Sequence, residues 1–212
     1  MMLPLLHKYF IVLLCGFMVA FSSENEILEQ VKKHYLLSAP FQVRLAVQQK
    51  SQTQKSSSET IGAFYLGKND RFRVDFPEQT VIFDGKAFWS FDKKMDQVVI
   101  EDLNPRSGMK LIYDLMKGNW SGFYIGKSTV QKPGSLTRLQ LTPKDKNAFF
   151  KSIILTIDLK SGMLKSIVYR DFQKNDVTIV LADEKSCEKE EKELLRTDQF
   201  QKTQIIDLRN GN

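Results

Sequence analysis

Residues 71–91 read RFRVDFPEQTVIFDGKAFWSF, and this stretch decides the fold. Within residues 71–76, apolar and charged residues alternate with a period of two, which is the pattern of a half-buried β-strand. The dipeptide Asp84-Gly85 separates two apolar runs, and Asp-Gly in this position is a strong signal for a tight hairpin because the turn needs positive φ. The stretch therefore predicts a meander of antiparallel strands joined by short turns.

Similar short strand patterns occupy most of the chain outside this stretch. Further strands are predicted at 41–48, 61–66, 97–101, 123–130, 136–141, 149–158, 163–172 and 177–182. Two amphipathic helices are predicted among them, at 24–37 and 104–117, from apolar residues at three- and four-residue spacing. About ten strands at hairpin spacing imply a large antiparallel sheet that curls, with the helices across its concave face. The expected fold is therefore mainly β with α: an open, incomplete antiparallel β-barrel of about ten strands covered by amphipathic helices.

The first residues have the features of an export signal. Lys8 precedes an apolar run from Tyr9 to Phe21 that is shorter than the ~20 residues needed to cross a bilayer. Small residues follow at Ala20 and Ser22, so residues 1–22 are predicted to be a signal peptide, with an uncleaved anchor as the alternative. The remaining residues, 23–212, are expected to form a single domain with a charged C-terminal segment at 184–197.

The composition argues against several functional classes. The histidines are His7 and His34 and the cysteines are Cys15 and Cys187, which excludes a Cys/His zinc cluster and an internal disulfide framework. The sequence has no Gly-rich phosphate loop, no Gly-x-Ser-x-Gly elbow and no visible nucleophile–base pair. We therefore expect no catalytic residue, no metal site and no cofactor, and a protein that is not an enzyme. The net charge of +6 is mild and its signs are interspersed, so we expect no nucleic-acid partner.

The candidate site consists of apolar side chains that share strand faces. The candidate cavity residues are Phe72, Val74, Phe76, Trp89, Phe91, Ile153 and Leu155. One interpretation is an ordinary hydrophobic core. The other is an apolar pocket closed by the two helices.

The central part of the chain resembles the outer-membrane lipoprotein carrier family, LolA-like. Residues 71–79 resemble its aromatic strand and Pro-acidic turn, and residues 81–92 contain its Asp-Gly-Lys-x-Phe-Trp-x-Phe pattern. Leu141-Thr142-Pro143-Lys144 matches a second motif, followed by a hairpin over 149–172. The resemblance covers roughly residues 26–182, and it rests on the order and spacing of motifs that are individually weak.

The resemblance implies a carrier that works in the periplasm as a monomer. Such a carrier takes an acylated lipoprotein from an inner-membrane lipoprotein-releasing ABC transporter and passes it to an outer-membrane acceptor. The acyl chains lie in a cavity that helices cover as a lid, and the expected lid residues are Met109, Ile112, Leu115 and Met116.

Two departures from the family pattern leave alternatives open. The family commonly has an arginine before the aromatic strand that helps hold the lid closed, and here Lys68 is the expected gating residue. The family's C-terminal Phe-x-Phe-x-Pro-Pro segment is missing. The alternatives are a lipid-sensing regulatory domain of the sigma-factor regulator type, or a carrier of another lipid or a glycolipid.

Overall fold

A computed structural model describes residues 23–69, 71–102, 108–130, 136–187, 195–197, 200 and 203–209. The predicted signal peptide at 1–22 lies outside the described residues, as do residues 188–194 of the predicted charged segment. Among the described residues, no helix combines the length and the apolar character that crossing a membrane requires.

Two helices and a single sheet make up the described structure. The helices are α1 (Glu24–Ser38) and α2 (Gly108–Lys117). The first strands are β1 (Phe41–Ser51), β2 (Ser56–Leu66), β3 (Phe72–Asp75), β4 (Gln79–Phe83), β5 (Ala87–Asp92) and β6 (Gln97–Asp102). The later strands are β7 (Phe123–Ile125), β8 (Thr129–Val130), β9 (Leu136–Pro143), β10 (Phe150–Asp158), β11 (Leu164–Asp171), β12 (Asn175–Ser186) and β13 (Gln204–Asp207).

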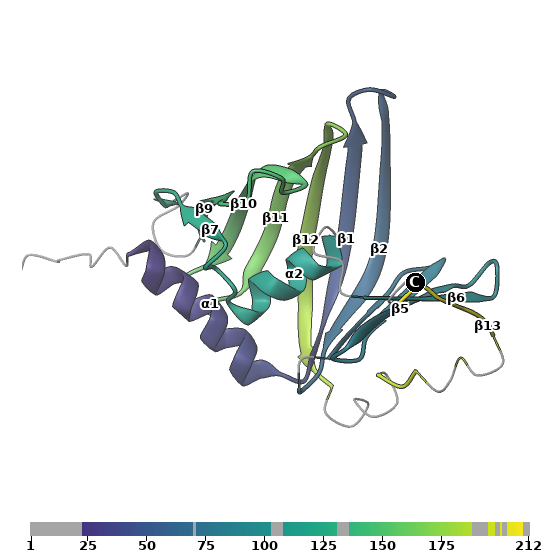
Figure 1. The fold of residues 1–212 in the computed structure, drawn as a ribbon. Coiled ribbons are helices and arrows are strands. Elements are labelled where there is room, and N and C mark those ends of the chain that lie inside the picture. The colour runs from purple at the N-terminus through teal and green to yellow at the C-terminus, as the bar shows by residue number, and fades with distance from the viewer. Residues whose placement is uncertain are drawn as a thin grey trace, which may run out of the picture.

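The 13 strands form one open sheet in the order β13-β6-β5-β4-β3-β2-β1-β12-β11-β10-β9-β7, with β8 paired to β9. All pairings are antiparallel except that of β13 with β6, which is parallel. Figure 1 shows that the sheet curls and that α1 and α2 both lie on its concave side. The predicted open barrel covered by amphipathic helices is therefore confirmed, and the short strands β7, β8 and β13 account for the larger strand number.

Helix α1 forms where the sequence predicts it because its N-terminus is capped and one face is apolar. The Ser23 hydroxyl accepts a hydrogen bond from the backbone N–H of Glu26, whose carboxylate in turn accepts one from the Ser23 N–H. This reciprocal capping box pairs two N–H groups that the first helical turn cannot satisfy internally. The apolar face is buried against the sheet through Ile27, Leu28, Val31 and Tyr35.

The Asp84 turn fixes the β4–β5 hairpin. Gly85 has φ +96°, which a glycine adopts without a steric cost. The Asp84 carboxylate accepts hydrogen bonds from the backbone N–H groups of Lys86 and Ala87 and from Nε1 of Trp89, at 2.8–2.9 Å. Partial burial opposes ionisation of Asp84, but these donors outweigh it and hold the pKa of the carboxyl below its usual value. Asp84 therefore has a structural role in the turn.

The register divides the apolar side chains of β3, β4 and β5 between two faces. Phe72 lies opposite Phe83, which lies opposite Phe88, so these three rings share the concave face. Ile82 lies opposite Trp89, and both point to the other, convex face because successive strand residues alternate. The concave face holds the main hydrophobic core, whereas a smaller convex cluster contains Ile82, Ala87, Val98, Ile100 and Phe200, with Trp89 and Phe91 packed against it.

Candidate functional site

Phe72 lies at the centre of an aromatic cluster on the concave face. Its side chain is fully buried, and its ring centroid lies 5.1 Å from that of Tyr113 on α2. The rings of Phe64, Phe83 and Phe88 surround it at 5.5–5.7 Å. Offset and edge contacts of this kind stabilise aromatic pairs beyond the area that they bury. The Tyr113 ring thus packs helix α2 against the aromatic cluster on this half of the sheet.

Val74 of β3 and Phe76, which follows the strand, also pack in the main core. Val74 is fully buried in the core, and Phe76 is partly buried against it. A Cβ atom on Gly62 of the neighbouring strand would lie only 2.5 Å from the Phe76 ring. Phe76 therefore lies directly over Gly62, where a larger residue would displace it.

Ile153 and Leu155 of β10 occupy the second half of the concave face. Both are fully buried in the same core as Phe72. Leu139 and Leu141 lie opposite Leu155 and Ile153 on β9, so the apolar surface continues towards the β7 edge of the sheet. The structure thus brings five of the predicted cavity residues onto one surface.

Trp89 and Phe91 do not join that surface, and a single cavity that contains all seven residues is not what the structure shows. Both lie on the convex face, where Phe91 packs against Phe200 with a centroid distance of 5.1 Å. The physical reason is the hairpin register, which places Trp89 opposite Ile82 and one residue out of phase with Phe88.

The predicted lid residues of α2 cover the concave face. Ile112, Leu115 and Met116 are each fully buried in the core. The side chain of Met109 lies outside the described part of the structure. Helix side chains therefore cover the concave face and keep its apolar surface from contact with water.

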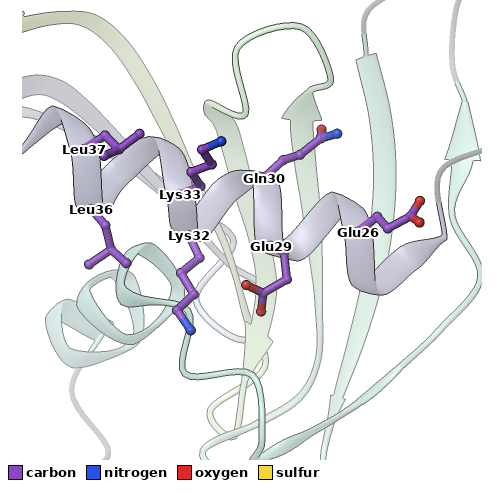
Figure 2. A pocket seen from close by; sticks show the side chains of 7 residues that line it. All are labelled: Glu26, Glu29, Gln30, Lys32, Lys33, Leu36 and Leu37. Atoms are coloured by element: carbon purple, nitrogen blue, oxygen red, sulfur yellow. The ribbon is translucent and has the colours of Figure 1, made fainter.

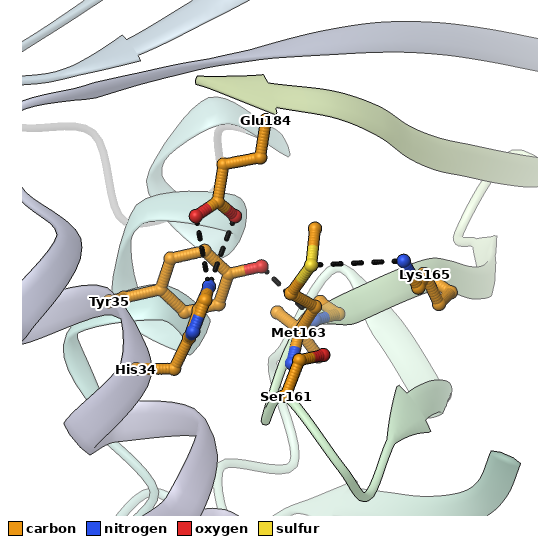
Figure 3. Close-up of polar contacts among 7 residues, drawn as sticks. His34, Tyr35, Ser161, Met163, Lys165 and Glu184 are labelled. Carbon is orange, nitrogen blue, oxygen red and sulfur yellow. Dashed lines mark hydrogen bonds and ion pairs between the residues drawn. The ribbon is translucent and has the colours of Figure 1, made fainter. Parts of the chain in front are cut away.

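Polar contacts attach α1 to the sheet at several points (Figure 3). Nε2 of His34 lies 3.0 Å from a carboxylate oxygen of Glu184 on β12. The Tyr35 hydroxyl accepts a hydrogen bond from the backbone N–H of Leu164 at 3.0 Å, and burial, together with the nearby Glu184 charge, raises the pKa of this phenol. The sequence alone indicates only a half-exposed helix residue at His34, because the partner lies 150 positions away in the chain.

The turn before β3 contains one predicted residue and one that the prediction missed. Lys68 lies exposed in the β2–β3 turn, and its backbone carbonyl accepts a hydrogen bond from the Arg71 N–H. The Arg71 guanidinium donates to the backbone carbonyl of Leu195 in the C-terminal segment. The arginine immediately before the aromatic strand thus contacts the C-terminal segment, and the gating role of Lys68 stays a prediction.

The outward surface of α1 is mostly polar, with Leu36 and Leu37 exposed near its C-terminus, and it lies away from the concave face. It borders a shallow pocket of about 590 Å³ lined by Glu26, Glu29, Gln30, Lys32, Lys33, Leu36 and Leu37. Figure 2 shows Lys32 and Leu36 on one flank of the helix and Lys33 and Leu37 on the other. This pocket belongs to the solvent side of the helix that covers the core, and it is distinct from the predicted cavity.

The site contains apolar surface and little that could perform chemistry. Among the described residues, no group of three or more His, Cys, Asp or Glu side chains is placed to hold a metal ion. An apolar concave surface under two helices can sequester a hydrophobic ligand if a helix moves away. The geometry therefore defines an open sheet whose apolar concave face is covered by two helices.

Comparison with known proteins identifies the family. The family described as "Outer membrane lipoprotein carrier protein LolA" matches residues 41–201. The chain therefore belongs to the LolA family of outer membrane lipoprotein carrier proteins.

Individual relatives are distant. An outer-membrane lipoprotein carrier protein of Histophilus somni (strain 2336) is 26% identical over 159 residues, covering 71% of this chain and 72% of the relative. One of Alkalilimnicola ehrlichii is 24% identical over 123 residues, covering 55% of each chain. The crystal structure of an uncharacterized conserved protein from Thermus thermophilus matches with a TM-score of 0.56 at 17% identity, covering 86% of this chain and 98% of that one. This likeness supports the fold.

Proposed function

We propose that this protein is a periplasmic carrier that binds the acyl chains of lipoproteins in its concave interior and shuttles them from the inner to the outer membrane. One observation carries the proposal: among the described residues, two helices cover the apolar concave face of an open sheet, and one of them is a ten-residue segment. Membership of the lipoprotein carrier family supports the choice of ligand. The role requires binding and release, and no catalytic group.

Closure of the lid makes the binding of an acyl chain reversible. Each buried CH₂ is worth ~0.8 kcal/mol, so a chain of about 16 carbons would contribute on the order of 12 kcal/mol against water. The α2 side chains Ile112, Leu115 and Met116 are buried on the same apolar surface. The acyl chain must displace them, and the free energy of lid closure is therefore subtracted from that of binding.

We propose that α2 moves while α1 stays in place. The hydrogen bonds of His34 and Tyr35 attach α1 to the sheet near its C-terminus, and Glu24 accepts hydrogen bonds from Ser128 near its N-terminus. Helix α2 packs on the sheet through the Tyr113 ring and buried apolar side chains, and its Met116 can adapt to a guest. Met109, Ile112, Leu115 and Met116 remain the proposed lid, and Lys68 the proposed gating residue.

The proposed route follows from the predicted export signal. After removal of residues 1–22, residues 23–212 act as a single-domain monomer in the periplasm. The carrier receives its cargo from an inner-membrane lipoprotein-releasing ABC transporter and delivers it to an outer-membrane acceptor. These partners are inferred from family membership.

The two tryptophans allow a direct test of where an acyl chain binds. Trp120 belongs to the concave core, whereas Trp89 packs on the convex face. A palmitoylated lipopeptide carrying bromine atoms on its chain should quench the fluorescence of Trp120 in the Trp89→Phe variant. It should leave the fluorescence of Trp89 unchanged in the Trp120→Phe variant at saturating ligand. Saturable quenching of Trp89, or no quenching of Trp120, would rule out the concave interior as the acyl site.

A further inference from the structure

Trp120 carries a buried hydrogen-bond donor without an acceptor. The residue is 8% exposed, and its indole Nε1 has no hydrogen-bond partner among the described residues. Trp89 provides a contrast within the same chain, because its Nε1 donates to the Asp84 carboxylate at 2.8 Å. A buried donor left unpaired is costly, and such groups in folded proteins need an explanation.

The position of Trp120 connects this donor to the proposed acyl site. It follows α2 directly, after the turn at Gly118, and it belongs to the same core cluster as the lid residues. It also lines a groove of about 390 Å³ between α1 and β7, with Leu28, Phe123 and Ile125 as apolar neighbours. The indole therefore lies between this groove and the core that α2 covers.

A second unpaired polar atom lies on the same face of the sheet. The Thr137 hydroxyl is fully buried and has no hydrogen-bond partner among the described residues. Thr137 lies opposite Ile157, which belongs to the concave core, and cross-strand partners share a face. The concave interior thus combines an apolar lining with two polar groups whose hydrogen-bonding capacity is unused.

We propose that Trp120 donates a hydrogen bond from Nε1 to the carbonyl oxygen of a bound acyl ester or amide. The inference rests on the proposed function, and it adds that the site recognises the acyl carbonyl as well as the hydrocarbon chain. A site that contains a buried donor disfavours an analogue without the acceptor, because the donor is then left unpaired. The carrier would thereby discriminate acylated ligands from other apolar molecules of the same length.

The test compares two ligands that differ by one carbonyl group. Monopalmitoylglycerol is an ester, and 1-O-hexadecylglycerol is the ether with the same chain and headgroup but no acyl carbonyl. Their affinities are measured by displacement of one fluorescent fatty acid from the wild type, Trp120→Phe and Trp89→Phe proteins. The ratio of ester to ether affinity within each protein is the readout, because it cancels any general change in stability or cavity shape.

We expect the wild type and Trp89→Phe to bind the ester roughly threefold to tenfold more tightly than the ether, and Trp120→Phe to lose this preference. The same preference in all three proteins, or none in the wild type, would overturn the assignment of Trp120 while leaving acyl binding intact. Failure of the wild type to bind either ligand would overturn the proposed function and this inference with it.

Discussion

Phe72 and Phe91 are strand phenylalanines on opposite faces of the sheet, and their truncation to alanine separates the roles of the two faces. Phe72 is fully buried beneath α2, whereas Phe91 is half-buried against the C-terminal segment. Replacing a fully buried phenylalanine by alanine costs about 3–5 kcal/mol, because the transfer free energy is lost and a closed cavity remains. For Phe91 we expect only about 1–2 kcal/mol, since part of the ring already contacts water and no closed cavity forms.

The predicted difference extends from stability to ligand binding. Phe72→Ala removes contacts with four rings, including Tyr113 of the proposed lid, and should weaken acyl binding, with the easier displacement of the lid offsetting part of this loss. Phe91→Ala should leave acyl binding unchanged. Urea denaturation gives the free energies of unfolding, and displacement of a fluorescent fatty acid gives the affinities. Equal stability losses, or a larger effect of Phe91→Ala on binding, would refute the division of the site between the two faces.

Three further substitutions test individual contacts. Asp84→Ala removes the acceptor for three hydrogen bonds and should lower the free energy of unfolding in urea by about 2–4 kcal/mol. An unchanged urea midpoint would contradict the structural role of this carboxylate. His34→Leu leaves the part-buried Glu184 carboxylate without its partner and should lower the free energy of unfolding by about 1–3 kcal/mol, measured by thermal unfolding. A double-mutant cycle with Glu184→Leu should show coupling between the two positions, and strict additivity would exclude the contact. Burial, with help from a nearby aspartate, raises the pKa of Tyr169 to about 12. Because the unfolded chain releases the phenol proton from about pH 10, the wild type should lose stability between pH 10 and 12. Tyr169→Phe should lose less over that range, and identical alkaline unfolding profiles would argue against a raised pKa.

Local pattern was enough to predict most helices and strands, although β2 begins at Ser56 and not at residue 61, and β12 continues to Ser186 beyond the predicted end at residue 182. The predicted helix at 24–37 corresponds to α1 at Glu24–Ser38, since its apolar spacing and its capping residues lie in one short stretch. The second helix was predicted from residue 104, and its described part begins at Gly108. Period-two alternation and the Asp84-Gly85 turn predicted the β3–β5 meander for the same reason. Each of these features depends on neighbours within a few residues.

Part of the candidate site could also be predicted from such patterns. Phe72, Val74 and Phe76 share a face because they are two residues apart, and the structure places them on the concave side. Trp89 and Phe91 were predicted to line the cavity but lie on the convex face, and the turns in the sequence already indicate this. The β3–β4 turn closes between Phe76 and Gln79, and counting through it and the next hairpin places Trp89 out of phase with Phe72.

The sequence by itself thus determined which segments form strands and helices and which side chains share a face within one strand. Only the tertiary structure decided which face became the concave interior, because that depends on the register across successive turns and on where α1 and α2 pack. It also decided the contacts of His34 with Glu184 and of Arg71 with Leu195, whose partners are separated by 150 and 124 positions. Contacts over such distances arise when the whole sheet assembles, and no short-range pattern encodes them.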